Sequence, residues 1–469
     1  MRLWMLAVAV LGLSAAVGVR AAQLLAAVAA SNAKVLCSAV FVSGRDLAEA
    51  RAHSLRLDPP GSRVRLDRAE PGLSVSIAGL IERRAVFAGD QGCVALPADR
   101  DSLAFEPVPV ESGLPPPETL DWPMGDLLPD APPAGIDTAR LEAAVEAAFA
   151  NPADLTTAFL VVHRGRLVAE RYAPGIGRDT QLESWSMGKS ITASLVGVLM
   201  QEGELRLDQR APVTEWQQTG DPRAQITVAH LLRMSSGLRF SFPTIESYDG
   251  TARPALAGLF WNGVPDHIRI YTGMEDVFRF AIDAPAEHPP GTVGRYRNSD
   301  PLVLGAIVRR VLEARGDDYL GWPQRALFDR IGVRRHVLET DVHGNFILTG
   351  YNYGTARGWA RLGLLYLQDG IWQRGRLLPE GFAEFVSTPA PAWREPLYGG
   401  LFWLNRTGRA PLPEDAYWMG GDGEQRVTIV PSLDLVVVRL GHVAGGDAAV
   451  ESLARSLELV AAAVTGGQD

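Results

Sequence analysis

The stretch that decides the fold reads SWSMGKSITASLVGVLM and runs from Ser184 to Met200. Its apolar residues recur at a helical period and Gly203 follows, so the sequence predicts a helix from about Ser186 to Glu202. Ser186 and Lys189 stand three residues apart, which places both side chains on one face where this helix begins. The N-terminus of a helix also offers a backbone N–H and a dipole that stabilise a developing negative charge.

Lysine is rare in this chain, and this makes Lys189 informative. Of the 45 Lys and Arg residues, only Lys34 and Lys189 are lysines. Arginine stays protonated in proteins, whereas a buried lysine can lose its proton and act as a general base. The apolar surroundings of Lys189 therefore predict a base beside Ser186 as nucleophile. A second Ser-x-x-Lys pattern, Ser31 to Lys34, is set aside because it lies near the N-terminus, outside any predicted core segment. On this pattern alone, a structural lysine is the alternative for Lys189.

A second polar motif follows later in the chain. Tyr296-Arg297-Asn298 stands after Pro289-Pro290-Gly291 and before an apolar helical run from Leu302 to Leu312. A tyrosine beside a Ser–Lys pair can pass a proton to the leaving group. An asparagine amide can orient a substrate carbonyl or the lysine. Tyr296 is therefore a candidate catalytic residue and Asn298 a candidate substrate-binding residue.

In this order the motifs resemble the family of serine β-lactamases, penicillin-binding proteins and related esterases, in its class C-like branch. Within that branch the similarity is greatest to 6-aminohexanoate-dimer hydrolases, and it extends from about residue 119 to the end. The stretches that carry it are Ser186–Lys189, Tyr296–Asn298, Asp121–Asp126, Thr227–Leu238 and Gly354–Leu367. The resemblance implies an acyl-enzyme on Ser186 that water then hydrolyses, and it implies no organic cofactor.

The expected fold class is α/β (α+β), β-lactamase-like. Strand patterns occur at Ala158–Val162, Leu167–Tyr172, Arg426–Val430 and Leu435–Leu440, and helices are expected at 137–150 and 447–464. Strands near both ends of the domain, with helices between them, predict one antiparallel sheet built from both ends and an inserted helical lobe.

The third motif of the family departs from its usual form. Relatives carry Lys or His, a small residue and Gly on a strand beside the nucleophile, and the nearest branch reads Gly-His-x-Gly-Gln. Here the sequence is Gly421-Asp422-Gly423-Glu424-Gln425. Asp422 stands where relatives have a cation that binds a substrate carboxylate, and its negative charge argues against β-lactams as substrates. We therefore rank amides and esters ahead of β-lactams and of peptidoglycan stem peptides. We still expect Asp422, Gly423, Glu424 and Gln425 to bind substrate, since a backbone N–H near Glu424 can serve as the second oxyanion donor.

Residues 1–30 are predicted to be a signal peptide or signal anchor, because an apolar run from Leu3 to Val19 lies between two arginines. The protein is then exported, periplasmic or held in the inner membrane by residues 3–19. In an exported protein, Cys37 and Cys93 predict one disulfide, with two free thiols as the alternative.

Three further units are expected. Residues 31–107 form a small β-rich unit with strand patterns at Ser38–Val42, Ser74–Ala78 and Ala85–Ala88. Residues 108–135 are a Pro-rich linker or wrapping segment, and residues 136–469 are the hydrolase domain.

Several classes of function are disfavoured. The net charge is −9 and no basic cluster with interleaved aromatics occurs, so nucleic acid is not an expected partner; a small-molecule amide or ester is. The eight histidines are scattered, and we expect no metal site. Two alternatives stay open. One is an α/β-hydrolase, since Ser184 to Gly188 is one residue short of Gly-x-Ser-x-Gly and His442 lies late in the chain. The other is a penicillin-recognising sensor that acylates without turnover.

Overall fold

The larger part of the chain is built on a six-stranded antiparallel sheet with the order β12-β13-β14-β15-β5-β6. This computed structural model describes residues 2–129, 135–241, 264–274 and 276–466. The strands are β5 (Thr156–His163), β6 (Arg166–Tyr172), β12 (Trp403–Leu404), β13 (Tyr417–Gly421), β14 (Gln425–Val430) and β15 (Leu435–Gly441). β15 pairs antiparallel with β5, with Val437 opposite Val161. The prediction of one sheet built from both ends of the domain is confirmed.

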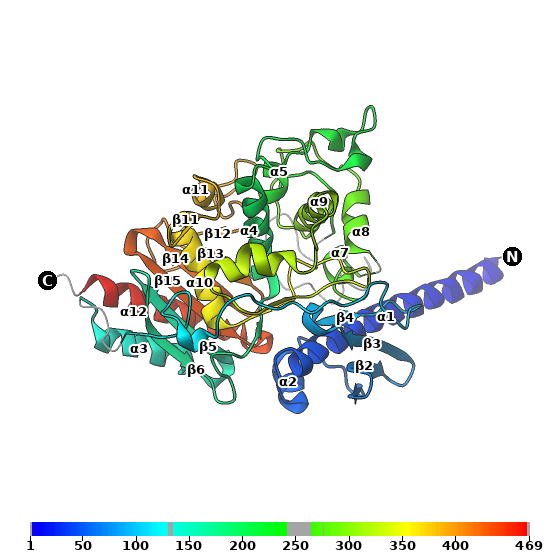
Figure 1. Cartoon of the computed structure of the whole chain (residues 1–469). Helices are drawn as coiled ribbons and strands as arrows, with labels where there is room; N and C mark the ends of the chain where they lie inside the picture. Colours follow the sequence, from blue (N-terminus) through cyan, green and yellow to red (C-terminus); the bar gives the residue numbers. More distant parts are fainter. Residues whose placement is uncertain (1, 130–134, 242–263, 275, 467–469) are drawn as a thin grey trace.

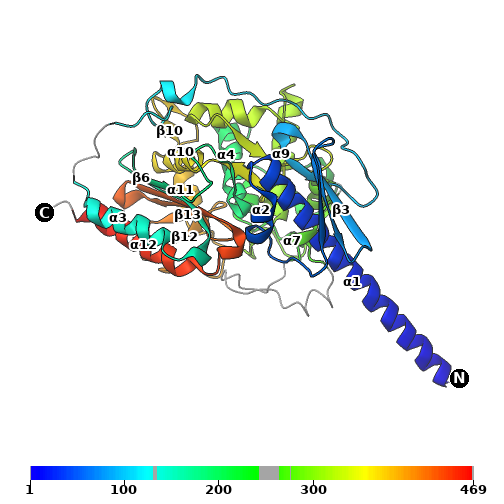
Figure 2. The same cartoon turned by 90° about the horizontal axis from the view of Figure 1, so that it is seen from below.

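Helices cover both faces of this sheet (Figures 1 and 2). α3 (Thr138–Phe149) and α12 (Ala449–Thr465) lie side by side on one face, and α10 (Ala356–Leu367) packs on the other. Alternate side chains of β5 supply the two cores: Phe159 and Val161 face α3 and α12, whereas Leu160 and Val162 face α10. Asp137 caps α3 by accepting a hydrogen bond from the Arg140 amide, as the sequence predicted.

A helical lobe is inserted between β6 and β12. Its helices are α4 (Gly188–Gln201), α5 (Val228–Leu232), α7 (Asp266–Arg269), α8 (Val277–Asp283), α9 (Ser299–Ala314) and α11 (Phe382–Ser387). Two small sheets accompany them: β7 (Leu182–Glu183), β9 (Asn352–Gly354) and β8 (His336–Leu338) in that order, and the hairpin β10 (Ile371–Trp372) with β11 (Gly375–Arg376). α4 packs against α9 at the centre of the lobe, and its first twelve residues, Gly188 to Leu199, are buried.

The N-terminal unit is a helix packed on a four-stranded antiparallel sheet. Its elements are α1 (Arg2–Phe41), α2 (Leu47–His53), β1 (Arg63–Asp67), β2 (Gly72–Ile77), β3 (Ile81–Phe87) and β4 (Cys93–Ala95). The β2–β3 hairpin is as predicted, and the predicted disulfide joins Cys37 of α1 to Cys93 of β4.

The strand predicted at Ser38–Val42 is wrong, because α1 continues through Phe41. The alanine-rich sequence before Ser38 favours a helix, and Ala29, Ala33 and Leu36 present an apolar stripe at helical spacing to the sheet. The short apolar run after Ser38 reads as a strand in isolation, but it extends this stripe.

α1 projects away from the rest of the molecule at its N-terminal end (Figure 1). It is continuous from Arg2 to Phe41, so the unit boundary expected at residue 30 falls inside it. Within the described residues, one helix segment, Gly18–Phe41, is long and apolar enough to cross a membrane, although 61% of its most apolar window is buried in the protein. Signal-peptide cleavage near residue 30 would cut through α1, and the residues after the cut belong to the core of the N-terminal unit.

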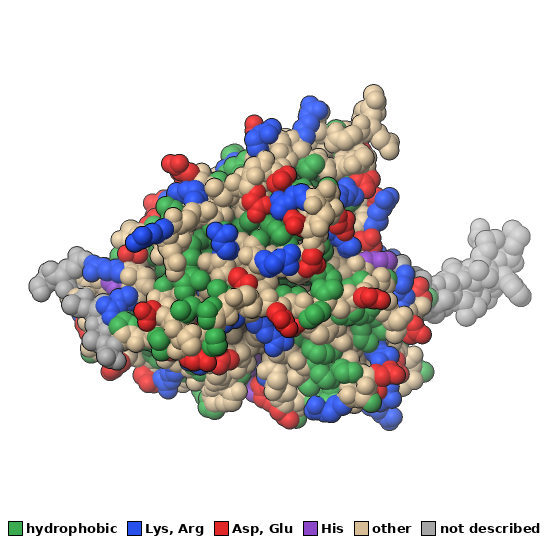
Figure 3. All heavy atoms as spheres, viewed as in Figure 1, with side chains coloured by type: hydrophobic (Ala, Val, Ile, Leu, Met, Phe, Trp, Pro, Cys, Tyr) green, Lys and Arg blue, Asp and Glu red, His purple; other side chains and the backbone are tan. Residues whose placement is uncertain are grey.

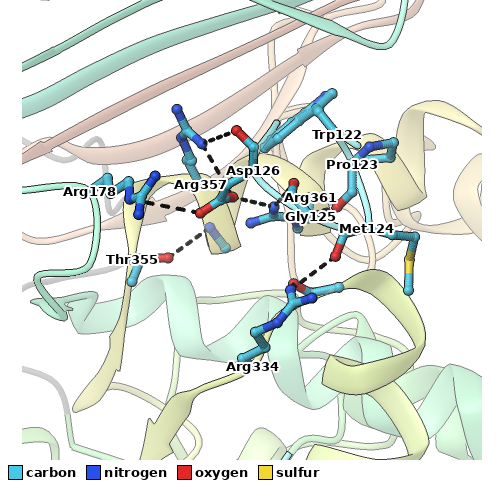
Figure 4. Close-up of polar contacts among 12 residues, drawn as sticks. Trp122, Pro123, Met124, Gly125, Asp126, Arg178, Arg334, Thr355, Arg357 and Arg361 are labelled. Atoms are coloured by element: carbon cyan, nitrogen blue, oxygen red, sulfur yellow. Dashed lines mark hydrogen bonds and ion pairs between the residues drawn. The ribbon is translucent and has the colours of Figure 1, made fainter. Parts of the chain in front are cut away.

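The Pro-rich segment wraps over the domain and is fastened to α10 by arginines (Figure 4). Arg361 donates to the carbonyl oxygens of Pro123 and Gly125, each at 2.6 Å, and to Asp126 Oδ1 at 2.7 Å. Arg357 also pairs with Asp126, at 3.2 Å. The Asp121–Asp126 stretch is therefore an anchored strap rather than a free linker.

The folded surface mixes charges of both signs (Figure 3). Arginines and carboxylates alternate over the lobe and the sheet, and no broad single-sign field dominates the face shown.

Candidate active site

Ser186 lies in a single 3₁₀ turn, Trp185–Met187, that leads directly into α4. Trp185 adopts a φ of 47°, a left-handed backbone conformation that is uncommon for residues other than glycine and recurs at functional sites. Gly188 is required by close packing, because a Cβ there would overlap the side-chain amide of Asn352 on β9. Ser186 is thus fixed at the N-terminal end of a buried helix, the position that the sequence predicted for it.

Lys189 is buried beside this serine. Its Nζ lies 3.1 Å from Ser186 Oγ and donates to the Thr349 carbonyl at 2.7 Å. Within the described part of the chain, no carboxylate forms an ion pair with Lys189. Burial lowers the pKa of Lys189 well below its usual value, because the charged form loses its hydration. Burial thus favours the neutral form of an amine that lies in hydrogen-bonding contact with the Ser186 hydroxyl.

Tyr296 forms the next wall of the site. Its ring centroid lies 4.7 Å from Lys189 Nζ, and the side chain is 6% exposed. Trp403 stacks on it at 5.3 Å, and Tyr398 meets it edge-on at 5.8 Å. These aromatic contacts hold the phenol ring in one orientation beside the amine.

Asn298 is tied to residues that sequence reasoning did not single out. Its Nδ2 lies 2.8 Å from His267 Nδ1 and donates to the Tyr271 hydroxyl at 3.2 Å. Tyr271 in turn contacts Thr349 Oγ1 at 2.6 Å. Among the described residues, Asn298 Oδ1 is buried and has no hydrogen-bond partner. Nothing in the sequence marks His267 or Tyr271, because their partners lie on distant segments.

His267 is neutral in this arrangement. Burial, with the nearby Lys189 as a second cause, lowers the pKa of His267 to about 3. A neutral ring accepts the Asn298 amide at Nδ1, and it adds no positive charge that would oppose a proton on Lys189.

The second Ser-x-x-Lys pattern, Ser31 to Lys34, lies in the core, contrary to the sequence-based expectation. Lys34 is fully buried, and its Nζ lies 2.6 Å from Glu339 Oε2. The same ammonium lies 4.8 Å from the centroid of Tyr351, whose ring contacts Trp185 at 5.1 Å. Lys34 is therefore an ion-paired lysine in the wall behind the nucleophile turn. Both lysines of the chain are buried, but Lys34 Nζ binds a carboxylate and a backbone carbonyl, whereas Lys189 Nζ contacts a serine hydroxyl.

The third motif lies at the end of β13, which runs beside the nucleophile turn. A Cβ at Gly421 would overlap the Ser184 carbonyl, so glycine permits this close approach. The residues that follow form the turn to β14, with Gly423 and Glu424 at φ values of 80° and 57°. The backbone at this turn is thus brought close to the segment that carries Ser186.

The side chains of the third motif are held by structural partners. Asp422 pairs with Arg56 of the N-terminal unit, and Glu424 pairs with Arg426 at 3.0 Å. Gln425 accepts a hydrogen bond from the Gly441 amide at 2.9 Å and joins β14 to β15. Substrate binding by Asp422, Gly423, Glu424 and Gln425 stays a prediction, and the backbone is the part that faces the site most directly.

A model of the Beta-lactamase family matches residues 142–462. A 6-aminohexanoate-dimer hydrolase of Paenarthrobacter ureafaciens is 27% identical over 234 residues, which span 49% of this chain and 57% of that protein. The chain thus spans little more than half the length of this curated relative.

Two solved structures share the fold. A Bacillus anthracis protein, provisionally named as a 6-aminohexanoate-dimer hydrolase, gives a TM-score of 0.54 at 21% identity and covers 74% of this chain and 88% of its own. A penicillin-binding protein homologue from Caulobacter crescentus gives a TM-score of 0.50 at 18% identity. The match covers 72% of this chain and 99% of that protein. The α/β-hydrolase alternative is wrong, since the sheet is antiparallel and Ser186 does not follow a parallel strand.

Proposed function

Because the chain belongs to the Beta-lactamase family, we propose that it is a serine hydrolase that cleaves an amide or ester bond of a small substrate through an acyl-enzyme on Ser186. The observation that carries this proposal is the buried Lys189 amine at 3.1 Å from Ser186 Oγ. A lysine in this position with its pKa lowered by burial suits a general base at neutral pH.

The first half-reaction follows from this geometry. Neutral Lys189 takes the proton of Ser186 as Oγ attacks the substrate carbonyl carbon. The oxyanion that forms is stabilised by the backbone N–H of Ser186 and a second backbone N–H at the end of β13. As the bond to the leaving group breaks, the proton passes from Lys189 to the departing nitrogen or oxygen, with Tyr296 as the relay.

Water completes the cycle. It attacks the acyl carbon and gives a proton to Lys189, and that proton returns to Ser186 Oγ as the acid product leaves. The unpaired Asn298 Oδ1 accepts a hydrogen bond from the substrate, which orients the bond to be cleaved.

The proposed substrates lack a carboxylate at the third-motif end of the site. Asp422 replaces the expected cation, and its partner Arg56 is engaged with it rather than free. An anionic substrate group would have to break that pair. Neutral short amides and esters are therefore proposed ahead of β-lactams.

The experiment is steady-state hydrolysis of p-nitrophenyl esters and short linear amides by the purified protein. Ser186→Ala should abolish turnover, and Lys189→Arg should lower kcat by at least about a hundredfold, because arginine keeps the charge but cannot act as a base. Lys34→Arg is the matched control, since Lys34 is the other buried lysine. A single stoichiometric burst without turnover would instead identify a sensor, and full activity in Lys189→Arg would reject the mechanism.

We further propose that the N-terminal part of α1 holds the protein in a membrane, with the folded domains on an oxidising side. The helix is continuous into the core and the Cys37–Cys93 disulfide requires an oxidising compartment. The full chain should sediment with membranes and resist carbonate extraction, whereas recovery as a shortened soluble protein would show cleavage.

A further inference from the structure

A cluster of histidines and carboxylates lies where α2 meets the turn after β15. Glu49 and His53 are one helical turn apart on α2, and His442 follows β15. One ligand atom from each of these three residues lies within 4.8 Å of the others. His53 Nδ1 is 2.8 Å from Glu49 Oε1, and His442 Nε2 is 3.5 Å from the same oxygen. Three potential metal ligands from two units of the protein therefore converge on one point.

The second nitrogen of His442 has its own carboxylate. His442 Nδ1 is buried without a hydrogen-bond partner and lies 3.9 Å from Glu183 Oε1, which is also buried and unpartnered. Metal-binding histidines commonly direct their other ring nitrogen at a carboxylate, which fixes the tautomer and the ring orientation. His442 is 4% exposed, so this ring is held between Glu183 on one side and Glu49 on the other.

The charges around the cluster are of both signs. Arg45 donates to both oxygens of Glu49, at 2.9 and 2.8 Å, which fixes the carboxylate and helps to keep it ionised. Arg45 and Arg439 are the positive groups that face His442, against Glu49 and Glu183.

We propose that Glu49, His53 and His442 form a divalent-cation site, best matched to Zn²⁺, that fastens α2 to the catalytic domain. Two imidazoles and one carboxylate are a ligand set that Zn²⁺ uses, with water in the fourth position. Tetrahedral Zn²⁺ with bonds of about 2.0–2.1 Å places its ligand atoms roughly 3.3 Å apart. The 2.8 and 3.5 Å separations from Glu49 Oε1 lie on either side of that value, whereas the cluster as a whole spans up to 4.8 Å and its two imidazole rings are stacked. The two rings would therefore have to shift when the ion binds.

The position of the site gives it a role. Glu183 belongs to β7, three residues before Ser186, so the metal would connect α2 through His442 and Glu183 to the strand that leads into the nucleophile turn. The cation is thus structural, and it touches no reacting atom. Sequence spacing gave no sign of it, because two ligands lie near the N-terminus and the third near the C-terminus.

The test is a calorimetric titration of the chelator-treated, untagged full-length protein with Zn²⁺, followed by thermal unfolding with and without the ion. We expect one Zn²⁺ per chain with a Kd at or below about 1 μM, and a Tm that rises by a few degrees at a hundredfold excess over Kd. His53→Ala and Glu49→Gln should each weaken binding at least about tenfold, and Glu183→Gln should weaken it by a similar factor through His442.

His288→Ala is the matched control, because the side chains of His288 and His53 are equally exposed, at 36%, and each lies beside a glutamate. It should bind Zn²⁺ as the parent protein does. The proposal is overturned if the parent protein binds no Zn²⁺ below about 100 μM, or if His53→Ala and His288→Ala bind it equally. His53 is partly exposed, so its loss is tolerated by the fold and a weakened titration is interpretable.

Discussion

The buried pair of Lys34 and Glu339 allows a quantitative test of how the N-terminal unit is attached. Glu339 accepts hydrogen bonds from Lys34 Nζ at 2.6 Å, Ser38 Oγ at 2.7 Å and the Cys93 amide at 2.7 Å. Both charged side chains are fully buried. Burial raises the pKa of Glu339 and lowers that of Lys34, while their mutual attraction opposes both shifts. The perturbation is Lys34→Met, which keeps the chain length and removes the ammonium.

The size of the effect follows from what is left behind. Glu339 would keep two neutral donors and lose its only counter-ion among the described residues, and breaking a buried ion pair from one side costs about 3–5 kcal/mol. With Lys34 gone, burial raises the pKa of Glu339 further, since only the hydrogen bonds from Ser38 and Cys93 still oppose that rise. The folded state then binds a proton more readily than the unfolded state, so the free energy of unfolding falls as pH rises. The loss should therefore be larger at about pH 8 than at about pH 5.

The assay is urea unfolding followed by tryptophan fluorescence at both pH values. Lys34→Met/Glu339→Gln should recover at least about 2 kcal/mol of the loss, because the neutral amide still accepts from Ser38 and Cys93 and no charge remains buried. An unchanged midpoint in Lys34→Met, or a double variant as unstable as the single one, would refute the reasoning.

Three further outcomes are expected. Burial holds the pKa of Lys189 well below its usual value, so kcat/KM for a neutral ester should fall only as pH drops through that lowered pKa. A kcat/KM that does not change with pH down to acid pH would contradict this. In chemical denaturation, Gly188→Ala should lower the free energy of unfolding by about 1–3 kcal/mol, and it should also reduce kcat. Gly177→Ala is the control, because space is open there, and its free energy of unfolding should stay within about 0.5 kcal/mol of the parent value. Asp126→Asn should lower the free energy of unfolding by about 3 kcal/mol in thermal unfolding, because the buried Arg361 guanidinium then has only carbonyl oxygens as partners. In limited proteolysis, the strap of this variant should be cleaved sooner than that of the parent protein.

The core of the fold and the contact between Ser186 and Lys189 could be predicted because the signals are local. The Ser186–Lys189 spacing lies within one helical turn, and the strands β5, β6, β14 and β15 each carry their own apolar alternation. The position of the Tyr296 motif after this helix then indicated that Tyr296 lies beside Ser186 and Lys189.

What could not be predicted depends on residues brought together from afar. The environment of Lys34 requires Glu339, a residue with no local signal, so its place in the sequence suggested an exposed end rather than a buried pair. The Ser38–Val42 run has strand propensity, but the tertiary contacts of α1 override it. His267 and Tyr271 join the site only through Asn298 and Thr349, which lie on other segments.

The central claim, that Lys189 activates Ser186, is tested most directly by a fluorophosphonate probe and peptide mass spectrometry. The probe should modify Ser186, and the rate of modification should fall at least about a hundredfold in Lys189→Arg but stay near the parent rate in Lys34→Arg. An adduct on another serine of the folded protein, or equal rates in the parent protein and Lys189→Arg, would contradict the account.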